Sequence, residues 1–474
     1  MGKTNKLGFW LLTALVVGNM VGSGIFMLPR SLSAAASPAG VIAAWLLTGF
    51  GVLMLALVFG NLGIRKPNIQ GGPQIYAGQL FKQGSKASTL SGFMSSWGYW
   101  IGNIAGIVAV ITTFAGYLST FFPVLTSNAP LVTINGFTLR VGNGLTFIIC
   151  TILLWGIHFI ILRGMESAGR LNFVATAAKV AGFFLFIIVG LFAFQKSNIL
   201  PFVAPRTDAA GHTLGLLPQV NNAAVNTLWA FIGIESAMVF SGRAKKSSDI
   251  KGATILGLLI SLVIYVGISF LAMGMLDQKT LIHSDKPLID AIQTVMGPLG
   301  CKVLAAIGLI SLFGSTIGWV MLSAEVPYQA AKQRLFLPSF MKENKKGLPV
   351  FSLLLTNGLG QLFIFSTVSK SISGAFDFIV LIATLAYLVP YFISSIYQMK
   401  LVITGETYEG NKTRWMDGVI AILATIYSTW VIIAGTADIK TFTYGVLLLA
   451  SGLFFCRPLM KKQEKVEQKN TVSA

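Results

Sequence analysis

Long apolar segments alternate with short polar loops along almost the whole chain. Twelve of these segments have about 18 residues or more, close to the ~20 residues with which an α-helix spans a bilayer. They cover residues 8–29, 38–62, 91–122, 142–162, 170–194, 221–241, 251–276, 296–326, 349–367, 372–397, 416–435 and 440–457. No loop between them is long enough for a soluble domain. The pattern predicts an all-α integral membrane protein with 12 transmembrane helices, a polytopic domain over residues 1–457 and a disordered tail over residues 458–474.

The first apolar segment is interrupted at its centre, where Gly18 to Gly24 read Gly-Asn-Met-Val-Gly-Ser-Gly. Glycine costs roughly 1 kcal/mol relative to alanine inside a helix. Open backbone at membrane depth is tolerated where it lines a cavity or is buried in protein. Close helix packing is the alternative use of small residues, but packing does not require Ser23 between two glycines or Asn19 one turn earlier. We therefore interpret the interruption as a site for a polar ligand halfway across the membrane.

The sixth segment is interrupted in the same way, with Gly233 and Glu235 at its centre. The two interruptions are five segments apart, which predicts a 5+5 inverted repeat with broken helices 1 and 6 and a ligand site at the membrane midplane. The repeats cover about residues 7–194 and 221–397. The segments at 416–435 and 440–457 fall outside the repeats, and we expect them to be peripheral.

Charge is sparse and unevenly distributed. Charged residues make up 11% of the chain, against about 25% in soluble proteins. With a cytoplasmic N-terminus, 25 of the 35 Lys and Arg fall on the cytoplasmic side and nine on the other. This split matches the positive-inside rule with both termini cytoplasmic, including the tail at 458–474. The net charge of +19 is therefore attributed to topology and anionic lipid, and not to nucleic acid.

Several function classes lack their signatures in the sequence. The three cysteines have no close spacing, which gives neither a metal motif nor a disulfide framework. The three histidines lie far apart, and there is no nucleophile elbow or phosphate loop, so we expect no enzyme, metal or cofactor. An ATP-driven pump would need a nucleotide-binding domain, and no loop of this chain is long enough to hold one. A channel would need a continuous polar face on several helices, whereas polarity here gathers at two interruptions.

Five motifs resemble those of one family. They are TALVVGNMVGSGIFMLP (Thr13 to Pro29), RKPNIQGGPQIYA (Arg65 to Ala77), SSWGYWIGNIAG (Ser95 to Gly106), LWAFIGIESA (Leu228 to Ala237), and GSTIGWVMLSAE (Gly314 to Glu325) followed by RLFLP (Arg334 to Pro338). In this order they resemble the amino acid–polyamine–organocation (APC) superfamily, and within it the basic amino acid/polyamine antiporter branch. The resemblance runs from about Leu7 to the tenth segment.

The resemblance implies a leucine-transporter-like fold that alternates access to a central site. The similar arginine/ornithine and arginine/agmatine exchangers imply that a cationic amino acid such as arginine is exchanged for ornithine, lysine or agmatine. Proton-coupled uptake of a neutral amino acid is the alternative. The implied setting is the cell membrane of a prokaryote. A homodimer stays open, because relatives often dimerise through their last helices.

The two interruptions offer backbone groups to an amino acid. If the first helix breaks at Gly22, Ser23 and Gly24, the unpaired amides that start its second half can bind an α-carboxylate. Unwound carbonyls can accept hydrogen bonds from the α-ammonium. The resemblance places these carbonyls at Met20, Trp229 and Ile232.

Side-chain selectivity is expected from three residues. The resemblance implies that Trp319 stacks on the substrate side chain, and an indole over a cation contributes ~0.5–2 kcal/mol. Trp229 is a second stacking face or gate, with an interfacial position as its alternative. Asn103 resembles the position that hydrogen-bonds the distal end of arginine; its alternative is a bond between helices. Ser95 and Gly106 stand where relatives carry aromatic or larger groups, which predicts a distal pocket that is roomier or differently shaped, so that its selectivity need not be for arginine.

Two charged residues fall within spans, where ionisable groups are functional candidates. Glu235 is expected to couple transport to protonation or helix movement, through the structure around the site more than as a direct ligand. Lys179 lies in the fifth segment. Sodium-coupled proteins of the same architecture hold an ion near this helix, so the ammonium of Lys179 is expected to replace that ion. The alternative for Lys179 is snorkelling to the cytoplasmic interface.

Overall fold

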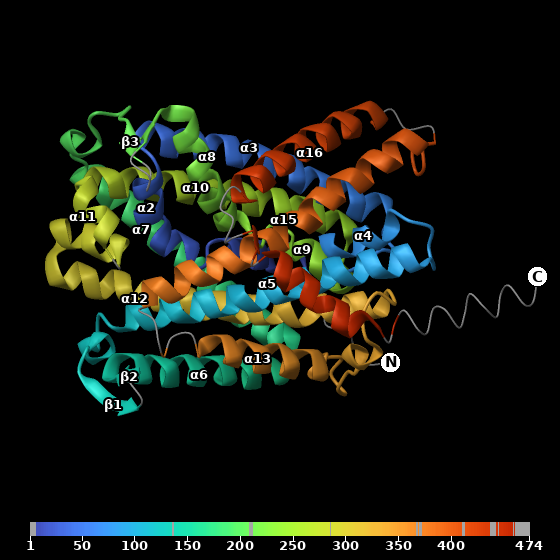
Figure 1. Ribbon diagram of the computed structural model, residues 1–474, viewed down its shortest axis with the longest axis horizontal. Coiled ribbons are helices and arrows are strands. Elements are labelled where there is room, and N and C mark those ends of the chain that lie inside the picture. Colours follow the sequence, from blue (N-terminus) through green and yellow to red (C-terminus); the bar gives the residue numbers. More distant parts are fainter. Residues whose placement is uncertain are drawn as a thin grey trace, which may run out of the picture.

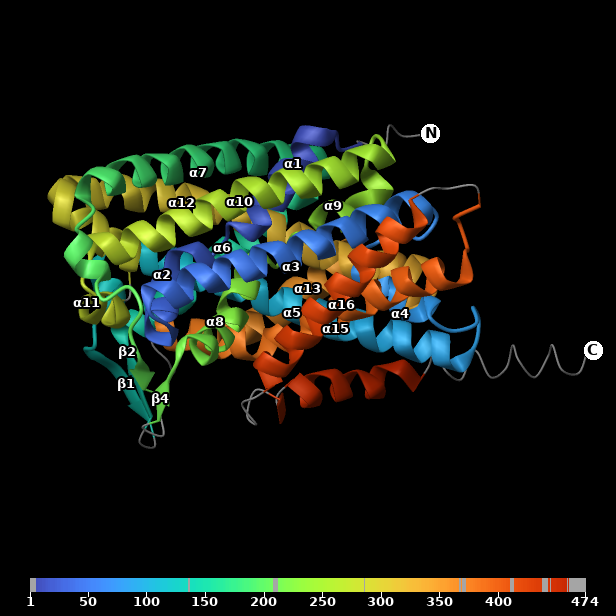
Figure 2. The same cartoon turned by 90° about the horizontal axis from the view of Figure 1, so that it is seen from above.

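The apolar segments fold into long helices that run side by side along one axis, as the computed structural model shows (Figures 1 and 2). The structure describes residues 6–134, 137–207, 212–284, 286–365, 368, 372–409, 413–436, 442–443, 445–457 and 459. The predicted tail at 458–474 therefore lies outside the described residues, apart from position 459. The helices are α1 (Phe9–Met20), α2 (Gly24–Ala35), α3 (Pro38–Arg65), α4 (Tyr76–Gln79), α5 (Lys86–Leu118), α6 (Val141–Leu162), α7 (Met165–Ala193), α8 (Leu216–Phe231), α9 (Ser236–Val239), α10 (Ser247–Met275), α11 (Gln278–His283), α12 (Pro287–Lys332), α13 (Val350–Ile364), α15 (Ile372–Thr404) and α16 (Arg414–Thr436), with a further helix at Gly445–Arg457.

The architecture confirms a mostly helical protein with many spans. Each of the twelve predicted segments contains a helix. Within the described residues, eight helices are long and apolar enough to cross a membrane, or nine if the bent pair α8–α9 is one span. The first span, α1 with α2, is the most enclosed, with 94% of its most apolar window buried against 33% for α16. The break in the first span therefore lies deep inside the bundle.

The longest helix is bent where the sequence predicted a span to begin. α12 covers 46 residues, but Gly297 has a left-handed φ of 58° and is followed by Pro298. Glycine adopts a left-handed backbone conformation more readily than any other residue, and the proline that follows has no backbone N–H to donate to the helix. The predicted segment at 296–326 thus begins at this bend, and the ten residues before the bend form a separate helical arm.

Two short hairpins lie outside the helices, and neither was predicted. β1 (Pro130–Ile134) pairs antiparallel with β2 (Phe137–Arg140), and β3 (Arg206–Thr207) pairs with β4 (Thr213–Leu214). In each hairpin, backbone N–H and C=O groups of the loop form hydrogen bonds with each other. Short 3₁₀ turns complete the loops: η1 (Pro73–Ile75), η2 (Pro123–Thr126), η3 (Lys196–Ile199), η4 (Phe240–Arg243) and η5 (Pro338–Met341).

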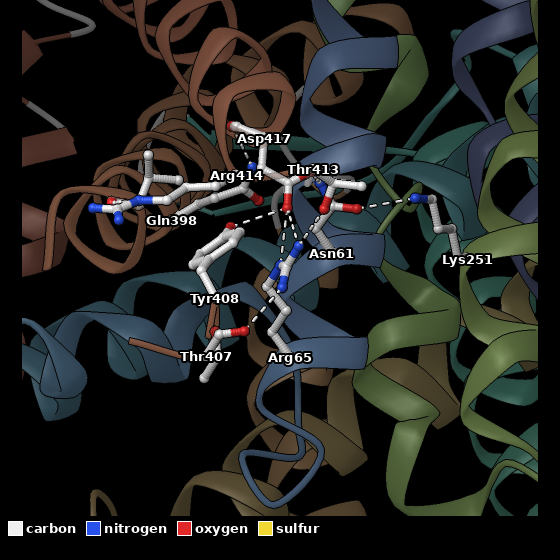
Figure 3. Close-up of polar contacts among 10 residues, drawn as sticks. Asn61, Arg65, Lys251, Gln398, Thr407, Tyr408, Thr413, Arg414 and Asp417 are labelled. Atoms are coloured by element: carbon white, nitrogen blue, oxygen red, sulfur yellow. Dashed lines mark hydrogen bonds and ion pairs between the residues drawn. The ribbon is translucent and has the colours of Figure 1, made fainter. Parts of the chain in front are cut away.

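A buried ion pair joins α3 to α16 (Figure 3). Oδ2 of Asp417 accepts from Nε of Arg65 at 2.9 Å, from Nη2 of Arg65 at 2.6 Å and from the hydroxyl of Tyr408 at 3.0 Å. Oδ1 accepts from Nδ2 of Asn61 at 3.0 Å, and Lys251 on α10 donates to Oδ1 of Asn61 at 2.9 Å. Burial and the bond to Asp417 raise the pKa of the Tyr408 phenol, which keeps it a hydrogen-bond donor. The cluster ties α16 to α3 and, through Asn61 and Lys251, to α10.

Asp417→Ala is expected to lower the free energy of unfolding by about 3–5 kcal/mol, because it leaves the guanidinium of Arg65 buried without its counter-charge. The side chains of Arg65 and Asp417 are only 11% and 8% exposed. Thermal unfolding of the purified protein in detergent measures this loss. Glu409→Ala removes an exposed carboxylate from the loop before α16 and serves as control. An equal loss of stability in both variants would contradict a special role for Asp417.

Candidate substrate site

The first span is broken where its glycines predicted. α1 ends at Met20, α2 begins at Gly24, and the three residues between them are not helical. The amide of Gly22 turns back to the carbonyl of Met20 at 2.7 Å. The first amides of α2 have no hydrogen-bond partner within their own helix. They form the positive end of the helix dipole. Met20, Gly22, Ser23 and Gly24 are all buried, so these groups face the protein interior.

The second break lies directly against the first. α8 ends at Phe231, α9 begins at Ser236, and the two helices are bent by 42°. Gly233 has a left-handed φ of 106°, and a Cβ on it would lie 2.8 Å from Cβ of Asn19 and 3.1 Å from the amide nitrogen of Met20. Nδ2 of Asn19 donates to Oγ of Ser236 at 2.8 Å. The two breaks therefore form one continuous patch of opened backbone.

Aromatic rings enclose this patch. Nε1 of Trp319 donates to the carbonyl of Asn19 at 3.0 Å, and a Cβ on Gly24 would lie 3.5 Å from the ring of Trp229. Tyr387 on α15 meets both indoles edge to face, with ring centroids 6.2 Å from Trp229 and 6.4 Å from Trp319. All three rings are buried. The structure thus brings together both predicted tryptophans and adds a tyrosine.

The predicted space beside Gly106 is not free. A Cβ on Gly106 would lie 2.5 Å from Cζ3 of Trp319, because the indole fills the room that the missing side chain leaves. The structure therefore has no extra room at Gly106, and a differently shaped distal pocket, the other alternative, stays a prediction. Ser95 lies about three turns before Gly106 on α5. It is buried, and its hydroxyl has no hydrogen-bond partner among the described residues.

Asn103 lies on α5 between Ser95 and Gly106. Its Nδ2 donates to the carbonyl of Tyr99 one turn earlier at 2.6 Å, and the side chain is fully buried. Its Oδ1 accepts no hydrogen bond from any described residue, and Oδ1 of Asn19 and the hydroxyl of Tyr387 also lack partners there. Buried polar atoms usually have partners. These atoms are free to bind a polar ligand.

Glu235 lies at the second break and is fully buried. The hydroxyl of Tyr99 on α5 donates to Oε1, and the hydroxyl of Tyr391 on α15 donates to Oε2. The amide of Gly233 also donates to Oε2, at 3.1 Å. The carboxylate therefore connects the break to two other helices and has its oxygens engaged by protein donors.

Lys179 is fully buried on α7, and its ammonium points at the first break. Nζ donates to the carbonyls of Gly18 and Val21 at 3.0 and 2.6 Å, and to Oγ of Ser315 on α12 at 2.6 Å. The snorkelling alternative is therefore wrong. The ammonium lies between three helices and uses its three donors on oxygen atoms, as a cation held by the broken helix would.

Sequence reasoning missed the partners of the site. Tyr99, Tyr387 and Tyr391 lie inside predicted spans, and a hydroxyl in an apolar span needs a polar partner; that signal was available. The sequence gives no signal, however, for which carboxylate or ring each tyrosine contacts. Within the described residues, no group of three His, Cys, Asp or Glu is arranged to hold a metal ion.

Comparison with known proteins gives consistent matches over nearly the full length. The family model described as amino acid permease matches residues 7–452. The putative arginine/ornithine antiporter of Bacillus subtilis is 50% identical over 469 residues, which are 99% of this chain and 100% of the relative. The arginine/ornithine antiporter of Pseudomonas aeruginosa is 37% identical, covering 95% of this chain and 90% of the relative. That of Latilactobacillus sakei is 32% identical, covering 89% and 84%.

Proposed function

The chain belongs to the amino acid permease family, and from that premise we propose that it exchanges a cationic amino acid, such as arginine, for ornithine, lysine or agmatine across the cell membrane of a prokaryote. The observation that carries the proposal is the contact between the two helix breaks under a set of aromatic rings. Relatives named as putative or established arginine/ornithine antiporters match 99% and 95% of this chain, which favours exchange over the alternative of proton-coupled uptake of a neutral amino acid.

In this proposal the breaks recognise what all amino acids share. The amides of Ser23 and Gly24 bind the α-carboxylate at the start of α2, where the helix dipole favours an anion. The amide of Gly22 joins them when it exchanges its bond to the carbonyl of Met20 for one to the carboxylate. The carbonyls of Met20, Trp229 and Ile232 accept from the α-ammonium. Because these are backbone groups, they do not select one amino acid from another, and agmatine, which lacks the carboxylate, uses only part of them.

The cationic end of the substrate meets the rings and Asn103. Trp319 and Trp229 present faces to which a guanidinium or ammonium is attracted. The free Oδ1 of Asn103 accepts a hydrogen bond from a guanidinium that reaches α5. These contacts distinguish a cationic from a neutral side chain.

Asn103→Ala is expected to raise the KM for arginine about tenfold, because one hydrogen bond to a charged group is worth about 1.5 kcal/mol. Exchange rates over a range of arginine concentrations measure this. Thr112→Val is the matched control, since Thr112 is buried on the same helix and, among the described residues, its hydroxyl bonds only to carbonyls of that helix, at Val108 and Ala109. A wild-type KM in Asn103→Ala would remove Asn103 from the site.

In this proposal Glu235 controls the movement of the second break, and Lys179 provides a fixed charge at the first. Glu235 holds the second break to α5 and α15 through Tyr99 and Tyr391, so releasing it lets the site open. Lys179 supplies a fixed positive charge at the first break, in place of a sodium ion. Exchange therefore proceeds without sodium.

The proposal includes the full architecture: 12 transmembrane helices, inverted repeats over residues 7–194 and 221–397, peripheral helices at 416–435 and 440–457, and cytoplasmic termini. The correspondence of the twelve predicted segments with helices supports the number of spans. The distribution of Lys and Arg supports the orientation. A homodimer through the last helices stays a prediction from family resemblance.

Proteoliposomes loaded with labelled arginine test the function. Label is expected to leave only when ornithine, lysine or agmatine is present outside, and at a rate that does not depend on sodium. Release that does not depend on external substrate would contradict exchange. Uptake of a neutral amino acid driven by a proton gradient would favour the alternative.

A further inference from the structure

A cavity of about 560 Å³ lies at the end of the bundle where α1 and α7 begin and α12 ends. Its walls come from the segment before α1, the start of α7, η4 after α9, the end of α12 and the loop after η5. Six basic side chains line it: Lys6, Arg163, Arg243, Lys332, Lys345 and Lys346. We refer to it as the basic cavity.

The positive charge of the basic cavity is largely uncompensated. Arg243 pairs with Glu325 at 3.0 Å, and Lys332 lies 3.7 Å from Glu343. Glu343, the only acid that lines the cavity in the part of the chain described, also accepts from the hydroxyl of Tyr328. Within the same residues, Lys6, Arg163, Lys345 and Lys346 form no ion pair; Nζ of Lys346 donates to a backbone carbonyl, that of Arg163.

The basic cavity lies beside the membrane surface. Trp10, on the first turn of α1 and four residues beyond Lys6, is 65% exposed, and tryptophan gathers at the membrane–water interface. Anionic headgroups there attract clustered lysines and arginines. A cationic amino acid is repelled by the same charge, so the cavity does not suit the proposed substrate.

We propose that the basic cavity is a binding site for a phosphate group, either on the headgroup of an anionic lipid or on a soluble phosphate. Arginine and lysine provide charge-assisted hydrogen bonds to phosphate oxygens, and here they come from separate segments of the chain. A single phosphate at the centre therefore contacts several of the walls at once and holds them together.

Under the alternating access of the proposed function, opening toward this side would separate the walls of the basic cavity. The amide of Leu7 donates to the carbonyl of Arg243 at 2.7 Å, and the amide of Lys245 donates to Leu7 at 2.8 Å, which joins the start of the first span to the end of the sixth. Arg243 in turn contacts Glu325 on α12 and the carbonyl of Gly347 at 3.3 Å. A bound phosphate stabilises the closed arrangement of these segments. This consequence rests on the proposed function; binding does not.

Thermal unfolding of the full-length, delipidated protein in neutral detergent tests binding. The probes are inorganic phosphate and short-chain phosphatidylglycerol, with chloride at equal ionic strength and short-chain phosphatidylcholine as references. Saturating phosphate or phosphatidylglycerol is expected to raise the Tm by about 3 °C or more. A shift with phosphatidylglycerol alone assigns the site to lipid, and a shift with both shows that the phosphate group suffices. No shift with either overturns the proposal.

Two variants make the test specific. Lys345→Gln with Lys346→Gln is expected to abolish the shift, whereas Lys82→Gln with Lys342→Gln removes the same charge outside the cavity and keeps it. Equal loss in both pairs overturns the proposal, because it would mean that any basic charge suffices.

A labelling experiment does not depend on the lysine variants. Ser167→Cys, which lines the cavity, is expected to react several-fold more slowly with a maleimide when phosphate or phosphatidylglycerol is bound. Lys342→Cys is expected to react at an unchanged rate, and the three natural cysteines are buried. Equal protection of both positions, or of neither, counts against the site. Because neither measurement uses transport, a protein that binds phosphate and fails to exchange arginine refutes the proposed function alone.

Discussion

Lys179→Met is expected to reduce arginine exchange roughly 100-fold. Its ammonium is the donor for the carbonyls of Gly18 and Val21 and for Oγ of Ser315, and all of these are buried. Methionine fills a similar volume but donates nothing, so two carbonyls at the first break lose a charged partner. Each lost bond of this kind destabilises by about 1.5–3 kcal/mol. The initial rate of arginine–ornithine exchange in proteoliposomes measures the effect.

Lys196→Met is the matched control, because Lys196 is exposed in η3 and the substitution is the same. It is expected to exchange at the wild-type rate. Calorimetric binding of arginine to the purified Lys179→Met protein separates a damaged site from a damaged fold: a folded protein with weakened binding is predicted. Wild-type exchange by Lys179→Met would mean that this cation does not support the first break.

Gly233→Ala is expected to abolish exchange. At a φ of 106°, any other residue is strained by about 1–3 kcal/mol. The added methyl group would also lie 2.8 Å from Cβ and 3.0 Å from the carbonyl carbon of Asn19, so the two breaks cannot stay in contact. Loss of both exchange and arginine binding is predicted, together with a lower Tm.

Gly156→Ala controls for the loss of a glycine. Gly156 lies in α6, and a Cβ there would meet no atom within 4 Å. Alanine is favoured over glycine in a helix by roughly 1 kcal/mol, so this variant is expected to be at least as stable as the wild type and fully active. If Gly233→Ala exchanges arginine as fast as Gly156→Ala, contact between the breaks is not needed for transport.

The breaks themselves could be predicted from the sequence because their signals are local. Glycines, a serine and an asparagine in an otherwise apolar run identify the first break, and a mid-span glutamate identifies the second. The position of Lys179 in a span was equally plain. Whether its ammonium reaches the membrane interface or stays in the interior could not be predicted, because that depends on oxygen atoms of α1 and α12.

The partners of these residues could not be predicted, because they come from distant parts of the chain. Tyr99 precedes Glu235 by 136 residues and Tyr391 follows it by 156. The error at Gly106 has the same origin: a missing side chain predicts space, but the indole of Trp319 from another helix fills it. The hairpin β1–β2 was missed although its signal is in the sequence: an Asn-Gly pair lies between two short runs rich in β-branched and apolar residues, a pattern typical of a hairpin.

Hydrogen–deuterium exchange of the unmodified protein tests the central claim most directly, namely that one amino acid binds the opened backbone of both breaks. Arginine and ornithine are expected to slow deuterium uptake in peptides that cover residues 20–26 and 229–236. Peptides from α6, at the edge of the bundle (Figure 1), are expected to be unchanged. Arginine that binds, as measured on the same sample, without protecting either break would contradict the account.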